Sequence, residues 1–417
     1  MRPWLRSTLI ALAALLMLPG ALAQPVRVGI VTFLSGPAAG PFGVPARNAA
    51  ELMAEVLNAG SVQAPYATKG FAGNPIELVI IDEAGGTQKQ VAEFRNLAPR
   101  VDMVIGYISS GDCLGIAPVA EELKKLTVLF DCGTPRIFED ASYKYVFRTG
   151  PHATLDSVST ALYLLEKHPK VQSIAGINQN YAWGQDSWAD FEAAVKAMKP
   201  GIEVKTSQMT KLYSGQFGAE ISTLMSSGAE VIHSSFWGGD LEGLVLQGAP
   251  RGLFQKHIVV LAAGEPAINR LGTKIPEGTI IGARGPFGPF APDTPFARWF
   301  KNAYQERYQV APNYASYKMA QAILGLKAAY EKAGGARPTQ EQIIAAFEGL
   351  TFEGPGGPVR MTLGKGHQAV MDAAVGTAKH VGGELQIVDI KRYPADKVNP
   401  PEAVKSEAWI KSGFKSR

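Results

Sequence analysis

Hydroxyl, aromatic and small residues stand directly after several apolar stretches of the chain, where short loops begin. These loops are "LSGPAAGPFG" (34–43), "GYISSGDC" (106–113), "FDCGTP" (130–135), "NQNYAWGQ" (178–185), "FWGGD" (236–240) and "AAGEP" (262–266). Backbone N–H groups at the start of a helix bind anions without any formal charge. The loops therefore fit a site in which uncharged groups hold a carboxylate, while aromatic and acidic side chains hold the rest of a ligand.

Motifs for catalysis or for a bound cofactor do not occur in the sequence. The six histidines form neither an H-x-H nor an H-E-x-x-H pair, so no metal site is indicated. The sequence also lacks a G-x-S-x-G elbow, a G-x-x-x-x-G-K-[ST] loop and a G-x-G-x-x-G motif after its first apolar stretch. We therefore predict a binding protein with no catalytic residues, no metal and no cofactor.

Apolar strand-like stretches alternate with helix-like stretches in two successive runs. The first run has strands near 26–34, 76–82, 101–108 and 126–131, and the second has strands near 173–178, 202–209, 230–236 and 258–263. Most of these stretches are continuously apolar, as strands covered on both faces must be. The pattern predicts an α/β fold with two similar lobes, each a parallel sheet flanked by helices. In such sheets, ligands bind beyond the carboxyl ends of the strands.

The expected domain boundaries follow from these two runs. We expect lobe 1 to comprise 24–149 and about 266–350, and lobe 2 to comprise 150–265 and about 351–383. Residues 384–417 are expected to form a C-terminal extension. The chain adds further helices after these two runs. This indicates that it passes between the lobes several times (these segments are called crossings below) before both lobes are complete.

The N-terminus and the overall charge indicate where the protein acts. Residues 1–23 contain Arg2 and Arg6, then an apolar run and an exit that ends at Ala23, which is typical of a signal peptide cleaved after that residue. We therefore expect a periplasmic location. The net charge is +4, without a block of lysine and arginine, which argues against a nucleic-acid partner.

Cys113 and Cys132 are the only cysteines. An even number of cysteines in an oxidising compartment favours a disulfide bond between them. The alternative is two buried free thiols.

At its loops the sequence resembles the periplasmic leucine/isoleucine/valine-binding protein family, the type I substrate-binding proteins of ABC importers. The resemblance extends from about Val26 to about Gly383. It rests on the order and spacing of "GIVTFLSGP", "IELVIID", "IGYISS", "YVFRTG", "NYAWGQ" and the segment that begins at Tyr213. It implies a two-lobed type I fold whose hinge consists of several crossings.

The resemblance also implies a set of ligand-binding residues. Ser110, with Ser109 as the near alternative, matches the serine that holds the ligand carboxylate, and Glu265 matches the acid that binds the ligand ammonium. Thr134 would bind carboxylate or amine. The implied ligand-binding set is Phe42, Ser109, Ser110, Cys132 (through its backbone alone), Thr134, Tyr181, Trp183, Trp237 and Glu265.

Several of these residues also have an ordinary structural interpretation. Ser110 could be a helix N-cap, because serine before a helix is a common cap. Thr134, which precedes Pro135, could be a turn residue. The two tryptophans could belong to the core, and Glu265 could lie on the surface.

The function implied by the resemblance is that of a receptor for an ABC importer. It would bind an amino-acid-like or other small polar organic ligand between its lobes and deliver it, as a monomer, to the permease and ATPase complex. Ligand would stabilise the closed form. Two alternatives remain open: a ligand sensor for a signalling partner, and a secreted amidase or hydrolase.

Overall fold

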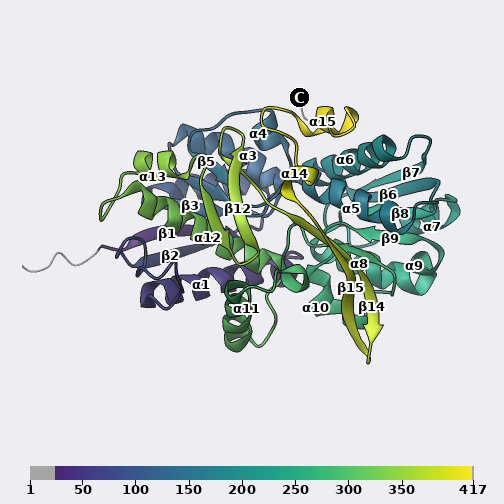
Figure 1. Cartoon of the computed structure of the whole chain (residues 1–417), viewed down its shortest axis with the longest axis horizontal. Helices are drawn as coiled ribbons and strands as arrows, with labels where there is room; N and C mark the ends of the chain where they lie inside the picture. The colour runs from purple at the N-terminus through teal and green to yellow at the C-terminus, as the bar shows by residue number, and fades with distance from the viewer. Residues whose placement is uncertain (1–23, 416–417) are drawn as a thin grey trace, which may run out of the picture.

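A computed structural model describes residues 24–415, which form two mainly parallel β-sheets with helices packed against them (Figure 1). The first sheet has eight strands in the order β11-β12-β13-β5-β4-β3-β1-β2. Their bounds are β1 (Val26–Thr32), β2 (Ile76–Asp82), β3 (Met103–Gly106), β4 (Thr127–Leu129), β5 (Val146–Arg148), β11 (Thr351–Gly354), β12 (Gly357–Leu363) and β13 (Gln368–Val370). Strands β1 to β5 are parallel, whereas β11, β12 and β13 form an antiparallel set that joins β5.

The second sheet has seven strands in the order β15-β14-β10-β9-β8-β6-β7. They are β6 (Ser173–Gln179), β7 (Glu203–Thr210), β8 (Val231–Ser234), β9 (Ile258–Leu261), β10 (Ile280–Gly282), β14 (Ala373–Val381) and β15 (Glu384–Tyr393). The central strands β6 and β8 are fully buried, whereas β7, at the edge, buries alternate residues more deeply. The continuous apolar runs in the sequence therefore correspond to strands that are covered on both faces.

Helices follow most of the strands, as the alternating pattern predicts. On the side of the first sheet these are α1 (Val44–Ala59), α2 (Thr87–Leu97), α3 (Ser110–Glu122), α4 (Arg136–Glu139), α11 (Pro295–Tyr308), α12 (Tyr314–Ala333) and α13 (Gln340–Phe347). The others are α5 (Ala153–Lys167), α6 (Ala182–Met198), α7 (Gly218–Ser226), α8 (Gly238–Gly248), α9 (Leu253–Lys256), α10 (Pro266–Leu271), α14 (Ala395–Val398) and α15 (Ser406–Lys411). Short helical turns are η1 (Ala39–Gly43), η2 (Ala98–Arg100), η3 (Ala249–Arg251), η4 (Gly272–Lys274) and η5 (Gly288–Phe290).

The strand pairing confirms the α/β class with two sheets, but it differs from the expected boundaries. Residues 351–370 pair in the first sheet through β11–β13, although the sequence analysis placed them in lobe 2. Strand β10 pairs with β9 in the second sheet, although it falls within the range expected for lobe 1. Strand β15 pairs with β14 along its length, so residues 384–393 belong to the second sheet and not to an extension. We propose that the two sheets, with these corrected memberships, are the cores of the two lobes.

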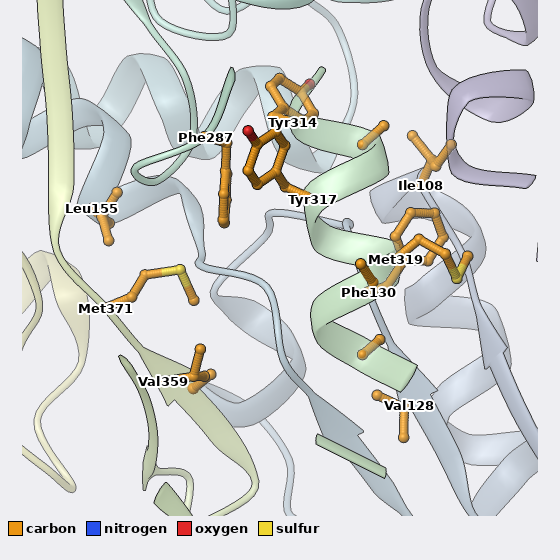
Figure 2. Packing of buried hydrophobic residues seen from close by; sticks show 14 of the residues in the cluster. Ile108, Val128, Phe130, Leu155, Phe287, Tyr314, Tyr317, Met319, Val359 and Met371 are labelled. Atoms are coloured by element: carbon orange, nitrogen blue, oxygen red, sulfur yellow. The ribbon is translucent and has the colours of Figure 1, made fainter. Parts of the chain in front are cut away.

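A buried apolar cluster fills the space around α12 and continues between the lobes. Figure 2 shows Tyr314 and Tyr317 at the start of α12 beside Phe287, and the rings of Tyr317 and Phe287 lie 5.8 Å apart. Further along the helix, Met319 lies near Phe130, at the end of β4 (Figure 2). Leu155 of α5 and Val359 of β12 belong to the same cluster, so the apolar core is continuous across the crossings.

The two cysteines form the expected disulfide. It joins Cys113, in the first turn of α3, to Cys132, in the loop after β4, and both residues are completely buried. The bond therefore ties together two loops at the carboxyl edge of the first sheet.

The expected signal peptide, residues 1–23, lies outside the described residues. Between residues 24 and 415, no helix combines the length and the apolar character that crossing a lipid bilayer requires.

Replacing both cysteines by alanine should lower the free energy of unfolding by about 3 kcal/mol, because the bond closes a chain segment of 19 residues and restricts the unfolded state. Urea denaturation of the wild type and of the Cys113→Ala, Cys132→Ala variant measures this difference. Wild-type protein unfolded and refolded under reducing conditions is the control for the lost side-chain volume. Equal unfolding free energies for oxidised and reduced wild type would contradict a stabilising role.

Candidate functional site

A small cavity lies where the carboxyl ends of strands from both sheets face each other. It has a volume of about 10 Å³ and is lined by Ile108, Ser110, Gly133, Tyr181, Trp183, Trp237, Arg284 and Tyr314. These residues follow β3, β4, β6, β8 and β10 or begin α12. The site therefore occupies the position at which ligands bind in sheets of this type.

Four of the eight residues that line the cavity are aromatic, and hydrogen bonds of their polar atoms orient several of them. The indole N–H of Trp183 donates to the Ser235 carbonyl at 2.8 Å, and that of Trp237 donates to the Tyr181 hydroxyl at 2.6 Å. Phe42 lies behind Trp237, with the two rings edge to face and 5.5 Å apart. Both tryptophan side chains are thus held with their N–H groups already bonded, which leaves ring surface for a ligand.

The loop that carries Ser110 is held by a buried glutamate. The carboxylate of Glu83 accepts hydrogen bonds from the backbone N–H groups of Ile108 and Ser109, each at 2.8 Å. Burial raises the pKa of Glu83 well above its usual range, and the nearby Asp112 adds to this rise. Ser109, rather than Ser110, caps α3, because its hydroxyl accepts from the Asp112 N–H.

Three N–H or O–H donors that reach the cavity are free to bind a ligand. The Ser110 hydroxyl oxygen accepts from the N–H groups of Gly133 and Thr134 at 3.1 and 3.2 Å, and its own hydrogen has no acceptor among residues 24–415. The Tyr181 hydroxyl accepts from Trp237 and likewise donates to no described residue. Arg284 Nη2 has one described partner, the Pro151 carbonyl, so one of its hydrogens is free.

A buried ion cluster holds Arg284 in place. Its Nη1 donates to the carboxylate and carbonyl of Asp131 at 2.7 and 2.8 Å, and its Nε donates to Asp156 at 3.2 Å. Lys318 of α12 donates to the same Asp131 oxygen at 2.6 Å. Arg284 also lies over the Trp183 ring, 4.4 Å from its centre, which adds a cation–π attraction.

Burial and the neighbouring charges both shift the pKa values of the residues in this cluster. Burial raises the pKa of Asp156 to about 6, although Arg284 and Lys318 favour its ionised form. Burial lowers the pKa of Lys318 to about 8, with a further decrease from Arg284 and an opposing effect of Asp131. Burial would lower the pKa of Arg284, but the two aspartates raise it above its usual value. Arg284 is therefore charged at any physiological pH.

Glu265 is close to the site but does not line the cavity. It is buried, its Oε2 accepts the Tyr314 N–H at 2.8 Å, and Oε1 lies against Gly288. Burial raises its pKa to about 8, opposed by the Tyr314 N–H and by Lys318. The side chain is thus protonated at neutral pH and is engaged with the start of α12.

Contacts between loops of the two lobes close the cavity. The Thr134 hydroxyl donates to Asp186 at 2.6 Å, and Arg136 donates to the same carboxylate. In the loop after β1, the Pro37 carbonyl accepts the Gly239 N–H at 3.1 Å. The uncharged loop near the N-terminus therefore contacts the segment that carries Trp237.

The structure brings some of the predicted residues together and separates others. Ser110, Tyr181, Trp183 and Trp237 line the cavity. The Thr134 hydroxyl is hydrogen-bonded to Asp186, and the Cys132 carbonyl accepts from Arg148 at 3.0 Å. Phe42, Ser109 and Glu265 do not line the cavity but lie behind its wall. Binding of ligand by any of these residues stays a prediction.

The sequence analysis did not select Arg284 or Tyr314. Arg284 has a positive φ of 49°, an uncommon conformation for a residue other than glycine. Its place in "GARGPFG", directly after the apolar run that forms β10, is the signal that could have indicated a strand-end loop.

The raised pKa of Glu265 gives a pH-dependent stability. Between about pH 4.5 and pH 8, the folded protein keeps a proton that the unfolded chain releases, so this residue's favourable contribution is complete below that window and is lost as pH rises through it. Glu265→Gln does not titrate and keeps an oxygen acceptor for the Tyr314 N–H. The variant should gain stability over the wild type by up to about 1.4 kcal/mol per pH unit in this window.

Urea denaturation of both proteins at several pH values across this window measures the effect. Parallel dependence of the two unfolding free energies on pH would show that Glu265 is not the titrating group.

Comparison with known proteins places this site in a family. The model of the periplasmic binding protein family matches residues 25–384. The Leu/Ile/Val-binding protein homolog 4 of Brucella melitensis is 24% identical over 346 residues, which cover 80% of this chain and 78% of that protein. The family match covers all strands of both sheets except β15, at whose first residue it ends.

Solved structures with the same fold include two that were described with ligands or in a closed state. A solute-binding protein of an ABC transporter from Rhodopseudomonas palustris, in complex with 3,4-dihydroxybenzoic acid, has a TM-score of 0.77 at 20% identity, covering 89% of this chain and 98% of that one. The closed leucine-, isoleucine-, valine-, threonine- and alanine-binding protein of Brucella ovis has a TM-score of 0.74 at 21% identity, covering 91% and 97%. The chain therefore belongs to the periplasmic binding protein family, and it binds a small solute instead of catalysing a reaction.

Proposed function

We propose that this protein is the periplasmic receptor of an ABC importer and that its ligand is a small aromatic carboxylic acid. The observation that carries the proposal is the chemistry of the cavity wall. Its eight residues supply four aromatic rings and three free hydrogen-bond donors, one of which belongs to a permanently charged guanidinium, but no carboxylate. A planar organic anion matches this set of groups.

An amino acid fits the wall less well, because its ammonium group needs an acceptor. The acid expected for that role, Glu265, does not line the cavity, and its pKa of about 8 keeps it protonated at neutral pH. The likeness to a receptor crystallised with a benzoic acid derivative supports the same class of ligand. Leucine and related amino acids therefore form the comparison group for the test.

Binding would couple to closure of the lobes. The cavity of about 10 Å³ is far smaller than the range of about 300–1,000 Å³ that is usual for ligand pockets, so an aromatic acid cannot occupy it in this conformation. The lobes must separate for the acid to enter, and they must then close around it less tightly than they do here. Ser110 would hold the carboxylate from the first lobe, while Trp183 and Trp237 would cover the ring from the second. The closed form with ligand would then be recognised by the permease.

Benzoate, 4-hydroxybenzoate and 3,4-dihydroxybenzoate should raise the melting temperature, because a ligand that binds the folded state alone stabilises it. Benzamide, which has the same ring without the charge, and leucine should cause little change. A thermal-shift screen measures these effects, and titration calorimetry on Ser110→Ala should show about tenfold weaker binding of the best acid.

Stabilisation by leucine, isoleucine or valine, together with no response to the aromatic acids, would contradict the proposed ligand class. Equal stabilisation by benzamide and benzoate would show that the charge is not recognised.

Gly133 offers a test of closure that does not depend on the ligand class. A Cβ atom at this position would lie 2.3 Å from the Trp183 ring and 2.6 Å from Arg284 Nη2, so Gly133→Ala should keep the lobes apart. Solution scattering should show a larger radius of gyration for this variant than for the wild type, when both are saturated with the compound that stabilises the wild type most in the thermal-shift screen. Gly111→Ala is the matched control, because its Cβ would meet no atom closer than 3.6 Å. Equal radii for the two variants would contradict closure at this contact.

A further inference from the structure

A second and larger cavity lies outside the cleft and shares none of its lining residues. It has a volume of about 280 Å³, and its walls come from the segment around α4, the turn between β12 and β13, and residues 400–405. Residues 400–405 connect α14 to α15, which Figure 1 shows at the C-terminal end of the chain near α4 and α6. The C-terminal segment thus closes one side of this cavity.

Arg148 lines the cavity and is completely buried, yet it has no ionic partner. Its Nε donates to Gln368, and its Nη1 donates to the carbonyls of Cys132 and Thr134 at 3.0 and 2.6 Å. Nη2 donates to no acceptor among residues 24–415, and no carboxylate in that range forms a salt bridge with this guanidinium. Glu139 and Asp186 attract this guanidinium from a distance, but burial still lowers its pKa to about 9. Because a buried charge without a directly bonded counter-charge is costly, the cavity is suited to an anion.

The other polar groups of the wall agree with an anionic ligand. His152 is buried, and burial lowers its pKa to about 3, so its imidazole ring is neutral. The two carboxylates of the wall are both engaged: Glu139 accepts from the Ser406 N–H at 3.0 Å, and Glu402 accepts from the Lys365 N–H at 2.8 Å. The acids of the wall therefore already have partners, while Nη2 of Arg148 has capacity to bind.

The remaining wall is apolar. Phe138 and Leu363 face the cavity with Pro400, Pro401 and Val404. A hydrated inorganic ion would leave this surface in contact with water, whereas a short hydrocarbon chain would cover it. The combination of an apolar wall with one buried cationic group matches a carboxylate that carries an aliphatic tail.

We propose that this cavity is a second ligand site, which binds a short-chain aliphatic carboxylate with its carboxyl group on Arg148 and its tail against Phe138 and Leu363. The site is distinct from the cleft, although Arg148 also holds the carbonyls on either side of Gly133.

Hexanoate is the probe, and titration calorimetry measures its binding to the wild type. Trp237→Ala, which alters the cleft, should bind hexanoate as the wild type does. Ala141→Trp places a large side chain at an exposed position of the second cavity's wall and leaves Arg148 itself unchanged, and it should weaken binding about tenfold or more. Ala219→Trp, at an exposed position on α7, is the matched control and should bind normally.

Arg148→Gln should also lose hexanoate binding, with circular dichroism as the check that it folds; if it does not fold, the Ala141→Trp result decides. Hexylammonium, with the same tail and the opposite charge, should not bind the wild type. Normal binding by Ala141→Trp would overturn the proposal, as would loss of binding in Trp237→Ala alone, which would place hexanoate in the cleft. Equal binding of hexylammonium would overturn the assignment of an anion.

Discussion

The buried ion cluster of Arg284, Lys318, Asp131 and Asp156 is the interaction on which the rest of the site depends. It joins the loop after β4, the start of α5, the segment after β10 and helix α12, which come from both lobes. Removing one member of a buried ion pair leaves the other uncompensated and costs about 3–5 kcal/mol. The cluster therefore fixes the positions of these four segments relative to one another. It also holds the Arg284 guanidinium against Trp183 at the cavity wall.

Around this cluster, neighbouring loops are held by independent means. The disulfide ties the start of α3 to the loop after β4, and Glu83 binds the backbone on the N-terminal side of Ser110. Because these supports act on the first lobe alone, the loops keep their shape whether the lobes are open or closed. The second lobe contributes tryptophans whose N–H groups are already bonded, so each lobe presents a nearly preformed half of the site.

The sequence predicted what depends on local pattern, and it missed what depends on distant partners. Strands such as β1 and β6 were recognisable because continuous apolar runs are needed where both faces are covered. The pairing of β11–β13 with β5, and of β15 with β14, joins segments whose sequence carries no signal for the partner sheet. This is why the expected boundaries did not anticipate the sheets in which residues 351–370 and 384–393 pair.

The same distinction applies to the site. Ser110, Tyr181, Trp183 and Trp237 stand in loops directly after strands, so the topology alone brings them near the cavity. Arg284 depends on a positive φ and on three carboxylate or carbonyl partners far away in the sequence, none of which a local pattern reveals. The environment of Glu265 was equally hidden, because its burial results from the packing of α12 against the loop after β9.

The most direct test of the account is the crystal structure of a complex with 4-bromobenzoate, in which anomalous scattering locates the bromine atom. The account predicts a bromine peak between Trp183 and Trp237, with the carboxylate facing the Ser110 hydroxyl and Arg284. Absence of a bromine peak among the residues that line the cleft cavity, or a carboxylate turned away from both groups, would contradict it.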